Sequence, residues 1–318
     1  MEIKDKVLAK AKEAKEASRF IGNASTDLKN RIILKMTELL KQKKDILIKA
    51  NVVDIKNAEK KGLTKALIDR LTLTEKRIDE MVKGLEEIVS LPDPVGEITK
   101  MWLRPNGMLV GRMRVPIGVI GVIYEARPNV TVDVTGLCLK AGNSVVLRGG
   151  SEAINSNIAL VKILKEALKK EKMHEGVVSY IDIPKRETVL EMVKLEGLID
   201  LIIPRGGEGL IRTVTENSRI PVLKHYKGVC HVFVDREADL SMAEEICFNA
   251  KVQRPATCNA METMLVDESI AKKFLPKMLK RFEKAGVQLK GCQKTKKIYP
   301  KVMDVTEEDF YKEYLDLI

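Results

Sequence analysis

Apolar residues recur at helical spacing, about every 3.6 residues, through most of positions 1–90. Val7, Ala11 and Ala14 share one such face. A second stripe, within 27–60, consists of Ile32, Ile33, Met36, Leu39 and Leu40. A further helix is predicted to begin at 74–75 and to end at the Leu-Pro-Asp-Pro of 91–94, because proline cannot continue a helix. We therefore expect the N-terminal part of the chain to be helical.

The next segment, 97–113, has the pattern of a β-hairpin. Its middle is the Arg-Pro-Asn-Gly of 104–107. After it, Met108, Val110 and Arg112 occupy every second position, which is the spacing of one face of a strand. Asn-Gly supplies residues that tolerate positive φ, which tight hairpin turns require.

From position 115 onward, apolar runs alternate with helical segments. Strands are predicted at 117–124, 144–147, 176–181 and 199–203, and helices at about 128–140, 152–170, 186–195 and 208–217. Runs that are apolar on both faces and separated by helices indicate a parallel sheet covered on both sides, as in a doubly wound Rossmann-type domain. A second α/β series follows, with strands at 231–235 and 261–266 and helices at 241–249 and 270–285. Residues 313–318 resemble the start of another strand.

Composition narrows the classes of protein to consider. The 318 residues include five cysteines, an odd number without paired spacing. They indicate reduced thiols and a cytoplasmic protein rather than a disulfide framework. We expect no metal site, because no Cys/His cluster accompanies the three histidines. We also expect neither a signal peptide nor a membrane span.

The net charge of +11 admits a nucleic-acid-binding protein as an alternative. Against this class, lysines alternate with acidic residues on the predicted helices, and aromatic residues that stack on bases are few. Solvated helix faces explain most of the charge. A site for anionic ligands, such as a dinucleotide and a phosphorylated substrate, explains some of the rest.

Cys258 has an unusual setting. It lies in the segment 253–260 (Gln-Arg-Pro-Ala-Thr-Cys-Asn-Ala), among small, polar and turn-forming residues, whereas a packing cysteine is more common in an apolar run. Nucleophilic cysteines react as thiolates, which a nearby cation or helix N-terminus stabilises. Arg254 is the candidate cation. An inert loop cysteine is the alternative that this segment alone leaves open.

Three further segments lie where predicted strands end. They are 124–130 (Tyr-Glu-Ala-Arg-Pro-Asn-Val), 139–151 (Leu-Lys-Ala-Gly-Asn-Ser-Val-Val-Leu-Arg-Gly-Gly-Ser) and 203–210 (Ile-Pro-Arg-Gly-Gly-Glu-Gly-Leu). Proline in the first suits the first turn of a helix. Glycines between a strand and a helix let the helix N-terminus approach a phosphate, although neither pair belongs to a GxGxxG motif and each also fits a plain tight turn.

In this order and spacing, the four segments resemble those of the aldehyde dehydrogenase superfamily, in particular its proline-synthesis branch, the glutamate-5-semialdehyde dehydrogenases. The resemblance implies an α/β fold with a Rossmann-type parallel-sheet cofactor domain (1–96 and 114–228), an oligomerisation hairpin (97–113) and an α/β catalytic domain (229–318). Members of that branch are longer, so the catalytic domain is expected to be incomplete at its C-terminus.

The resemblance further implies NADPH-dependent reduction of L-glutamyl 5-phosphate through a thioester on Cys258, with Asn129 as a donor to the oxyanion. Arg127 and Arg254 are the implied substrate contacts. The implied contacts to NADP(H) are Arg148, Gly149, Gly150, Ser151, Pro204, Gly206 and Gly207. A guanidinium at position 148 suits the 2′-phosphate of NADP. Implied partners are further copies of the chain and glutamate 5-kinase, with no nucleic acid and no membrane.

One departure from the superfamily separates reduction from aldehyde oxidation. Oxidising members have a glutamate base in the segment that aligns with 223–228 (Leu-Lys-His-Tyr-Lys-Gly), where this chain has Lys224 and no carboxylate. Hydrolysis of a thioester needs such a base to activate water. The difference favours acyl-phosphate reduction, and an acylating dehydrogenase that uses CoA or phosphate with another acyl chain is the alternative. His225 and His231 are expected to be structural.

Overall fold

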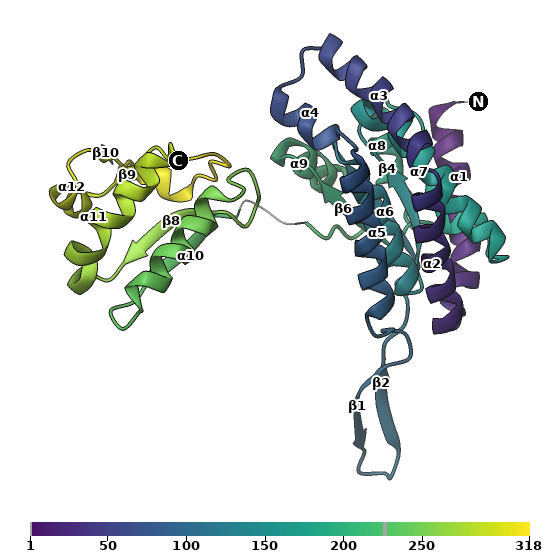
Figure 1. Ribbon diagram of the computed structural model, residues 1–318. Helices are drawn as coiled ribbons and strands as arrows, with labels where there is room; N and C mark the ends of the chain where they lie inside the picture. Colours follow the sequence, from purple (N-terminus) through teal and green to yellow (C-terminus); the bar gives the residue numbers. More distant parts are fainter. Residues whose placement is uncertain (1, 225–227) are drawn as a thin grey trace. The chain divides into compact units, whose positions relative to one another are not determined.

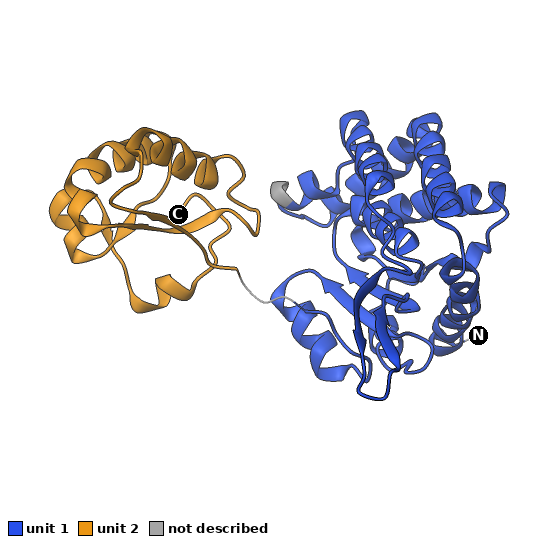
Figure 2. Cartoon of the chain, turned by 90° about the horizontal axis from the view of Figure 1, so that it is seen from below, with its two compact units in different colours: residues 1–224 blue, residues 225–318 orange. Residues whose placement is uncertain are grey.

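The structure, a computed structural model, describes residues 2–224 and 228–318, without the side chains at positions 65 and 66. The chain forms two compact units, Met1–Lys224 and His225–Ile318 (Figure 2). The predicted boundary after position 228 is close to this division, and His225 lies outside the described residues. None of the described helices is long and apolar enough to cross a membrane.

A four-stranded parallel sheet forms the centre of the first unit. Its strands are β3 (Val119–Tyr124), β4 (Ser144–Arg148), β5 (Val178–Tyr180) and β6 (Leu201–Arg205), in the order β5-β4-β3-β6. The helices between and after them are α6 (Pro128–Lys140), α7 (Ile154–Lys170), α8 (Glu187–Met192) and α9 (Glu208–Asn217). Every residue of β3 and β4 is buried, as their continuous apolar runs predict. The Rossmann-type sheet is therefore confirmed.

Helices cover both faces of this sheet (Figure 1). The N-terminal helices are α1 (Ile3–Gly22), α2 (Thr26–Gln42), α3 (Lys44–Lys60), α4 (Lys65–Leu71) and α5 (Glu75–Ser90). Ile120 and Val122 of β3 belong to the apolar core formed with α2, α5, α6 and α7, whereas Val119 and Ile123 pack with α1 and α8. This alternation follows from the two-residue repeat of a strand. Thr74 caps α5 by accepting a hydrogen bond from the Arg77 N–H at 3.2 Å, which confirms the predicted helix start.

The predicted hairpin is also confirmed. Strands β1 (Ile98–Leu103) and β2 (Leu109–Met113) pair antiparallel, and the turn between them places Gly107 at φ +83°. Asn106 Oδ1 accepts the Met108 N–H at 3.1 Å. Figure 1 shows the hairpin projecting beyond the helices of its unit.

The second unit contains a pair of parallel strands, β7 (Cys230–Val234) and β8 (Met261–Val266). Around them lie α10 (Leu240–Val252), α11 (Glu268–Lys284), α12 (Gln293–Ile298) and the short parallel strands β9 (Lys290–Gly291) and β10 (Met303–Asp304). The core of this unit includes Cys247, Met278 and Phe282.

Some strand predictions are wrong in part or whole. The predicted strands at 117–124 and 199–203 differ from β3 and β6 by two residues at one or both ends. Residues 313–318 form no strand, because Leu315 adopts a left-handed conformation (φ +54°) that interrupts an extended run. The strand predicted at 176–181 begins only at Val178. A 3₁₀ turn, Glu175–Val177, precedes it, and His174 Nδ1 caps this turn by accepting the Gly176 N–H at 2.9 Å.

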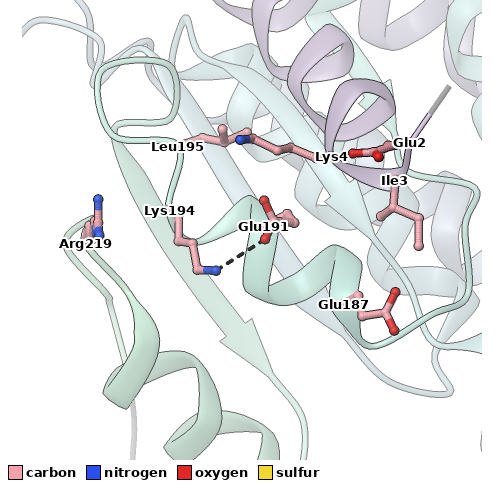
Figure 3. A pocket seen from close by; sticks show the side chains of 8 residues that line it. All are labelled: Glu2, Ile3, Lys4, Glu187, Glu191, Lys194, Leu195 and Arg219. Carbon is pink, nitrogen blue, oxygen red and sulfur yellow. Dashed lines mark hydrogen bonds and ion pairs between the residues drawn. The ribbon is translucent and has the colours of Figure 1, made fainter.

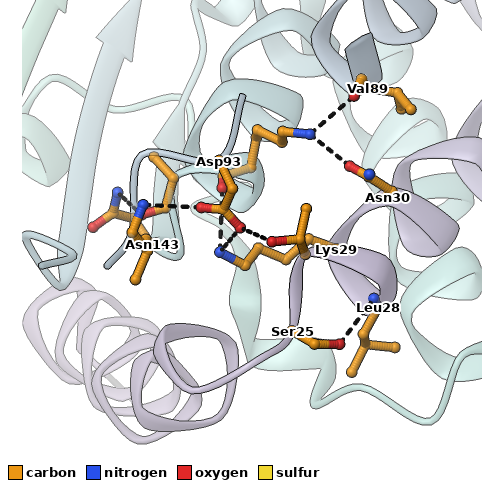
Figure 4. Close-up of polar contacts among 11 residues, drawn as sticks. Ser25, Leu28, Lys29, Asn30, Val89, Asp93 and Asn143 are labelled. Atoms are coloured by element: carbon orange, nitrogen blue, oxygen red, sulfur yellow. Dashed lines mark hydrogen bonds and ion pairs between the residues drawn. The ribbon is translucent and has the colours of Figure 1, made fainter. Parts of the chain in front are cut away.

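A buried ion pair connects α2 with the segment between α5 and β1, which leads into the hairpin (Figure 4). Lys29 Nζ lies 2.7 Å from Asp93 Oδ2, and the two side chains are 1% and 9% exposed. Asp93 also accepts hydrogen bonds from the Thr26 hydroxyl and the Val95 N–H. Burial raises the pKa of the Asp93 carboxyl, but the hydrogen bonds from Lys29, Val95 and Thr26 outweigh burial and hold this pKa below its usual range.

Asp93→Asn is expected to lower the free energy of unfolding at pH 7 by about 3 kcal/mol, because it leaves the Lys29 ammonium buried without its counter-charge. A carboxyl with a depressed folded pKa stabilises the protein above its unfolded pKa of about 3.9, and this stabilisation is lost as the pH falls through the folded value. Urea unfolding from pH 7 to pH 3 should therefore show an acid-dependent loss for the parent that is smaller in the variant.

The control for this experiment is Asp79→Asn, which removes a more exposed ion pair with Lys44. It should change the free energy of unfolding by about 0.5 kcal/mol or less. Equal losses for the two variants would contradict the role given to the buried pair.

Candidate active site

Three of the predicted segments meet at one edge of the sheet in the first unit. Strands β3, β4 and β6 are parallel, so their carboxyl ends lie at the same edge, which is where ligands bind in open α/β sheets. Two carboxylates join the loops that follow. Glu125 Oε2 accepts the Gly207 N–H at 2.9 Å, and Glu152 Oε1 accepts the Ala126 N–H at 2.8 Å.

Neither carboxylate was among the site residues predicted from the sequence. Glu125 directly follows β3, and Glu152 lies four residues after the end of β4. An acidic residue shortly after a buried parallel strand is the sequence signal by which they could have been found.

Glycine is required in the turn after β4. A Cβ at Gly149 would lie 2.2 Å from Asn157 Nδ2 and 3.1 Å from the Tyr124 ring. Both neighbours are held in place by Thr131. Its hydroxyl shares a hydrogen bond of 2.6 Å with the Tyr124 hydroxyl and donates to Asn157 Oδ1 at 2.9 Å. The turn therefore packs the Gly149 backbone directly against Tyr124 and Asn157.

The space at Gly206, directly after β6, is also narrow. A Cβ at Gly206 would meet Glu125 Oε2 at 2.5 Å, whereas one at Gly207 would have its nearest neighbour at 3.9 Å. Gly207 is the N-cap of α9. The Glu125 carboxylate oxygen thus lies against the backbone N–H at the N-cap of this helix, the kind of group that also binds phosphate oxygens.

The other predicted cofactor contacts have different surroundings. Arg148 is buried, and its guanidinium donates to Thr188 Oγ1 at 3.3 Å and to the carbonyl oxygens of Pro184 and Lys185, both at 3.2 Å. Pro204 is buried within β6 opposite Ile123. Ser151 is exposed and donates to Glu152. Arg148 thus holds the loop after β5, and the contact of each of these residues with a cofactor stays a prediction.

Asn129 and Arg127 lie at the start of α6, where Pro128 occupies the first turn as predicted. Asn129 is exposed, and its Nδ2 donates to Asp133 Oδ2 one turn later, at 3.0 Å. Burial raises the pKa of the Asp133 carboxyl, and the bond from Asn129 offsets part of this rise. Because an amide nitrogen has two hydrogens, one of them is left to meet a ligand.

Cys258 lies in the second unit, in the loop 253–260 between α10 and β8. Its side chain is exposed, and its carbonyl oxygen accepts a hydrogen bond from Cys230 Sγ at 3.3 Å. Within the loop, Thr257 Oγ1 donates to the Arg254 carbonyl at 2.8 Å. Arg254, in the same loop and four residues before Cys258, is also exposed. Since Cys258 and Asn129 belong to different units, their joint action stays a prediction.

The cysteines differ in how readily their thiols can react. Burial raises the pKa of Cys138 to about 12 and that of Cys247 to about 11, which keeps both as unreactive thiols at neutral pH. Cys292 is exposed like Cys258, and hydrogen bonds from Thr295 lower its pKa. Thiol reactivity alone therefore does not identify the nucleophile, and each modified cysteine must be located by mass spectrometry.

A pocket elsewhere in the first unit contains none of the predicted site residues. It lies between the start of α1, α8, the residues that follow α8 and the segment after α9 (Figure 3), and its lining mixes acidic and basic side chains. The lining residues are Glu2, Ile3, Lys4, Glu187, Glu191, Lys194, Leu195 and Arg219. We assign it no part in the reaction.

Residues 3–297 match the model of the aldehyde dehydrogenase family. The chain belongs to the aldehyde dehydrogenase family. Members of this family use a nicotinamide cofactor. The chain is 85% identical over 318 residues to a curated γ-glutamyl phosphate reductase of Thermodesulfovibrio yellowstonii, covering all of this chain and 76% of the relative.

Solved structures agree with this family. The γ-glutamyl phosphate reductase of Thermotoga maritima is similar with a TM-score of 0.92 and 48% identity, over 98% of this chain and 75% of that one. An acetylating aldehyde dehydrogenase from Geobacillus thermoglucosidasius has a TM-score of 0.65 at 17% identity, over 93% of this chain and 61% of that one, and shows the shared fold alone. The predicted aldehyde-dehydrogenase-like fold is thereby confirmed.

Proposed function

We propose that the protein reduces L-glutamyl 5-phosphate to L-glutamate 5-semialdehyde and phosphate with NADPH, as an oxidoreductase of proline biosynthesis. The observation that supports this most is the 85% identity, across the whole chain, to a γ-glutamyl phosphate reductase. The absence of a carboxylate from the segment 223–228 fits a reductase, which does not activate water against its thioester.

Cys258 is the proposed nucleophile. Its sulfur forms a bond to the acyl carbon, the bond from that carbon to the phosphate oxygen breaks, and phosphate leaves. Asn129 Nδ2 and the Cys258 N–H hold the negative charge on the acyl oxygen during this step. The product is a thioester on Cys258, and departure of the aldehyde returns the sulfur as a thiolate. Arg127 and Arg254 are the proposed contacts to the substrate's anionic groups.

The edge of the sheet in the first unit fits a dinucleotide. When bound there, NADPH supplies a hydride for the thioester carbon. The residues proposed to hold it are Arg148, Gly149, Gly150 and Ser151 at and after the end of β4, and Pro204, Gly206 and Gly207 at and after the end of β6. This proposal is supported by the hydrogen bond from the Gly207 N–H to the Glu125 carboxylate, which places an anionic oxygen at this helix start. We propose NADPH rather than NADH because of the guanidinium at position 148.

Gly149→Ala is expected to raise the dissociation constant for NADPH about tenfold or more, because the added methyl overlaps Asn157 and the Tyr124 ring and pushes the turn outward. Gly209→Ala is the matched control, since a Cβ there meets nothing within 4 Å. Fluorescence titration with NADPH measures both. Unchanged affinity in Gly149→Ala would remove this turn from the proposed cofactor site.

We also propose that the hairpin of β1 and β2 joins copies of this chain. It exposes apolar side chains to solvent, among them Ile98 (56% exposed), Leu103 (69%) and Leu109 (60%). Deleting residues 98–112 is expected to give a smaller assembly in light scattering. An unchanged mass would contradict this role.

We further propose that the protein acts in the cytoplasm, because its five free cysteines fit a reducing compartment. Glutamate 5-kinase, the source of the substrate, is the proposed partner enzyme.

The test of the function runs the reaction in reverse. With glutamate 5-semialdehyde and NADP, reduction of NADP should depend on added phosphate, which is the second product of the forward reaction. Replacing phosphate by CoA should give no reduction. A CoA-dependent or phosphate-independent reaction would instead favour another acylating aldehyde dehydrogenase.

A further inference from the structure

We propose that Lys251 and Glu262 are a positioning pair that holds the Cys258 loop in place. Lys251 lies in the last turn of α10 and Glu262 is the second residue of β8, so the two flank the loop 253–260. Lys251 Nζ lies 3.3 Å from Glu262 Oε2, and the two side chains are 3% and 2% exposed. The inference rests on the proposed function, because it concerns the proposed nucleophile.

Lys251 also ties the two ends of the loop together directly. Its Nζ donates to the carbonyl oxygen of Met261 at 2.9 Å. Met261 is the first residue after the loop, and the helix that precedes the loop ends one residue beyond Lys251. A single ammonium group therefore sets the separation between the loop's two ends.

Glu262 also connects the start of β8 to a third segment of the chain. Its Oε1 accepts the Leu315 N–H at 3.1 Å, while Oε2 faces Lys251. Within the loop, the Cys258 carbonyl oxygen accepts a hydrogen bond from Cys230 Sγ at 3.3 Å. With both ends and the cysteine backbone restrained, the direction of the thiol depends on a pair that never touches substrate.

Stability alone is a weak explanation for such a pair. Removing two charges from water is costly, and apolar residues of similar volume often stabilise a protein equally well or better. This gives a way to separate positioning from stability. The double variant Lys251→Met with Glu262→Leu has side chains of similar volume but removes the ion pair and the hydrogen bonds that the two side chains make, and we expect it to fold.

Two measurements on the double variant test the proposal. Hydrogen exchange of the amides in 253–260 should accelerate about tenfold or more, while exchange in α11 stays unchanged. Acylation of Cys258 by acetyl phosphate, located by mass spectrometry, should have a maximal rate lowered about tenfold or more at an unchanged half-saturating concentration, because misplacement of a nucleophile lowers the rate and not the binding.

The matched control is Lys294→Met, which breaks an ion pair with Glu268 whose side chains are 75% and 80% exposed. It should leave both measurements within about twofold of the parent. Alkylation of Cys292 by iodoacetamide, in the same unit, should be equal in all the variants and serves as an internal reference.

Loop exchange and acylation that stay within about twofold of the parent in the double variant would overturn the proposal. If the parent shows no acylation of Cys258 at all, the proposed function fails at its nucleophile, and loop exchange still decides whether the pair holds the loop. Unfolding of the double variant, seen in thermal melts, would also overturn the proposal, since the pair would then serve the fold.

Discussion

Cys258→Ala is expected to lower NADPH-dependent turnover of glutamyl phosphate by about 10⁴-fold or more, because no other group would form the acyl-enzyme. The free energy of unfolding should stay within about 0.5 kcal/mol of the parent, since the side chain is exposed and contributes little packing. Steady-state NADPH oxidation and urea unfolding measure the two quantities.

The control is Cys292→Ala, which removes another exposed cysteine of the same unit, one with a lowered pKa. This variant should keep full activity. If Cys292→Ala is inactive and Cys258→Ala is not, the thioester has been placed on the wrong cysteine.

Asn129→Ala is expected to lower kcat about a hundredfold with little change in KM, as loss of one oxyanion donor does. The donor acts mainly when charge develops on the acyl oxygen, so substrate binding should be nearly unaffected. Asp133→Asn is the control, because its amide oxygen still accepts the bond from Asn129 Nδ2. It should retain most of the activity.

The outcome that contradicts this role is a higher KM at unchanged kcat in Asn129→Ala. Such a result would make Asn129 a contact to the bound substrate instead of a donor to the oxyanion. Both variants are measured with glutamyl phosphate at saturating NADPH.

Much of the fold was predictable because its signals are local. The continuous runs of β3 and β4 predict buried parallel strands, and Pro128 predicts the start of α6. The Asn-Gly dipeptide predicts the hairpin turn, whose Gly107 has positive φ. Each of these features depends on neighbours in the sequence.

Features that depend on distant contacts were not predictable. The left-handed backbone at Leu315 comes with a bond from its N–H to Glu262, 53 residues earlier. Glu125 meets Gly207 across 82 positions, and Arg148 meets the loop after β5 across about 36 to 40 positions. Periodicity gives the face of a strand or helix but not the partner of a polar side chain.

The central claim is that glutamyl phosphate acylates Cys258 before hydride transfer. The most direct measurement is mass spectrometry of the protein mixed with glutamyl phosphate in the absence of NADPH, followed by addition of NADPH. The account predicts a glutamyl thioester on the peptide containing Cys258 that disappears when NADPH is added, with aldehyde released in equal amount. Turnover without any adduct on Cys258, or an adduct that NADPH does not discharge, would contradict it.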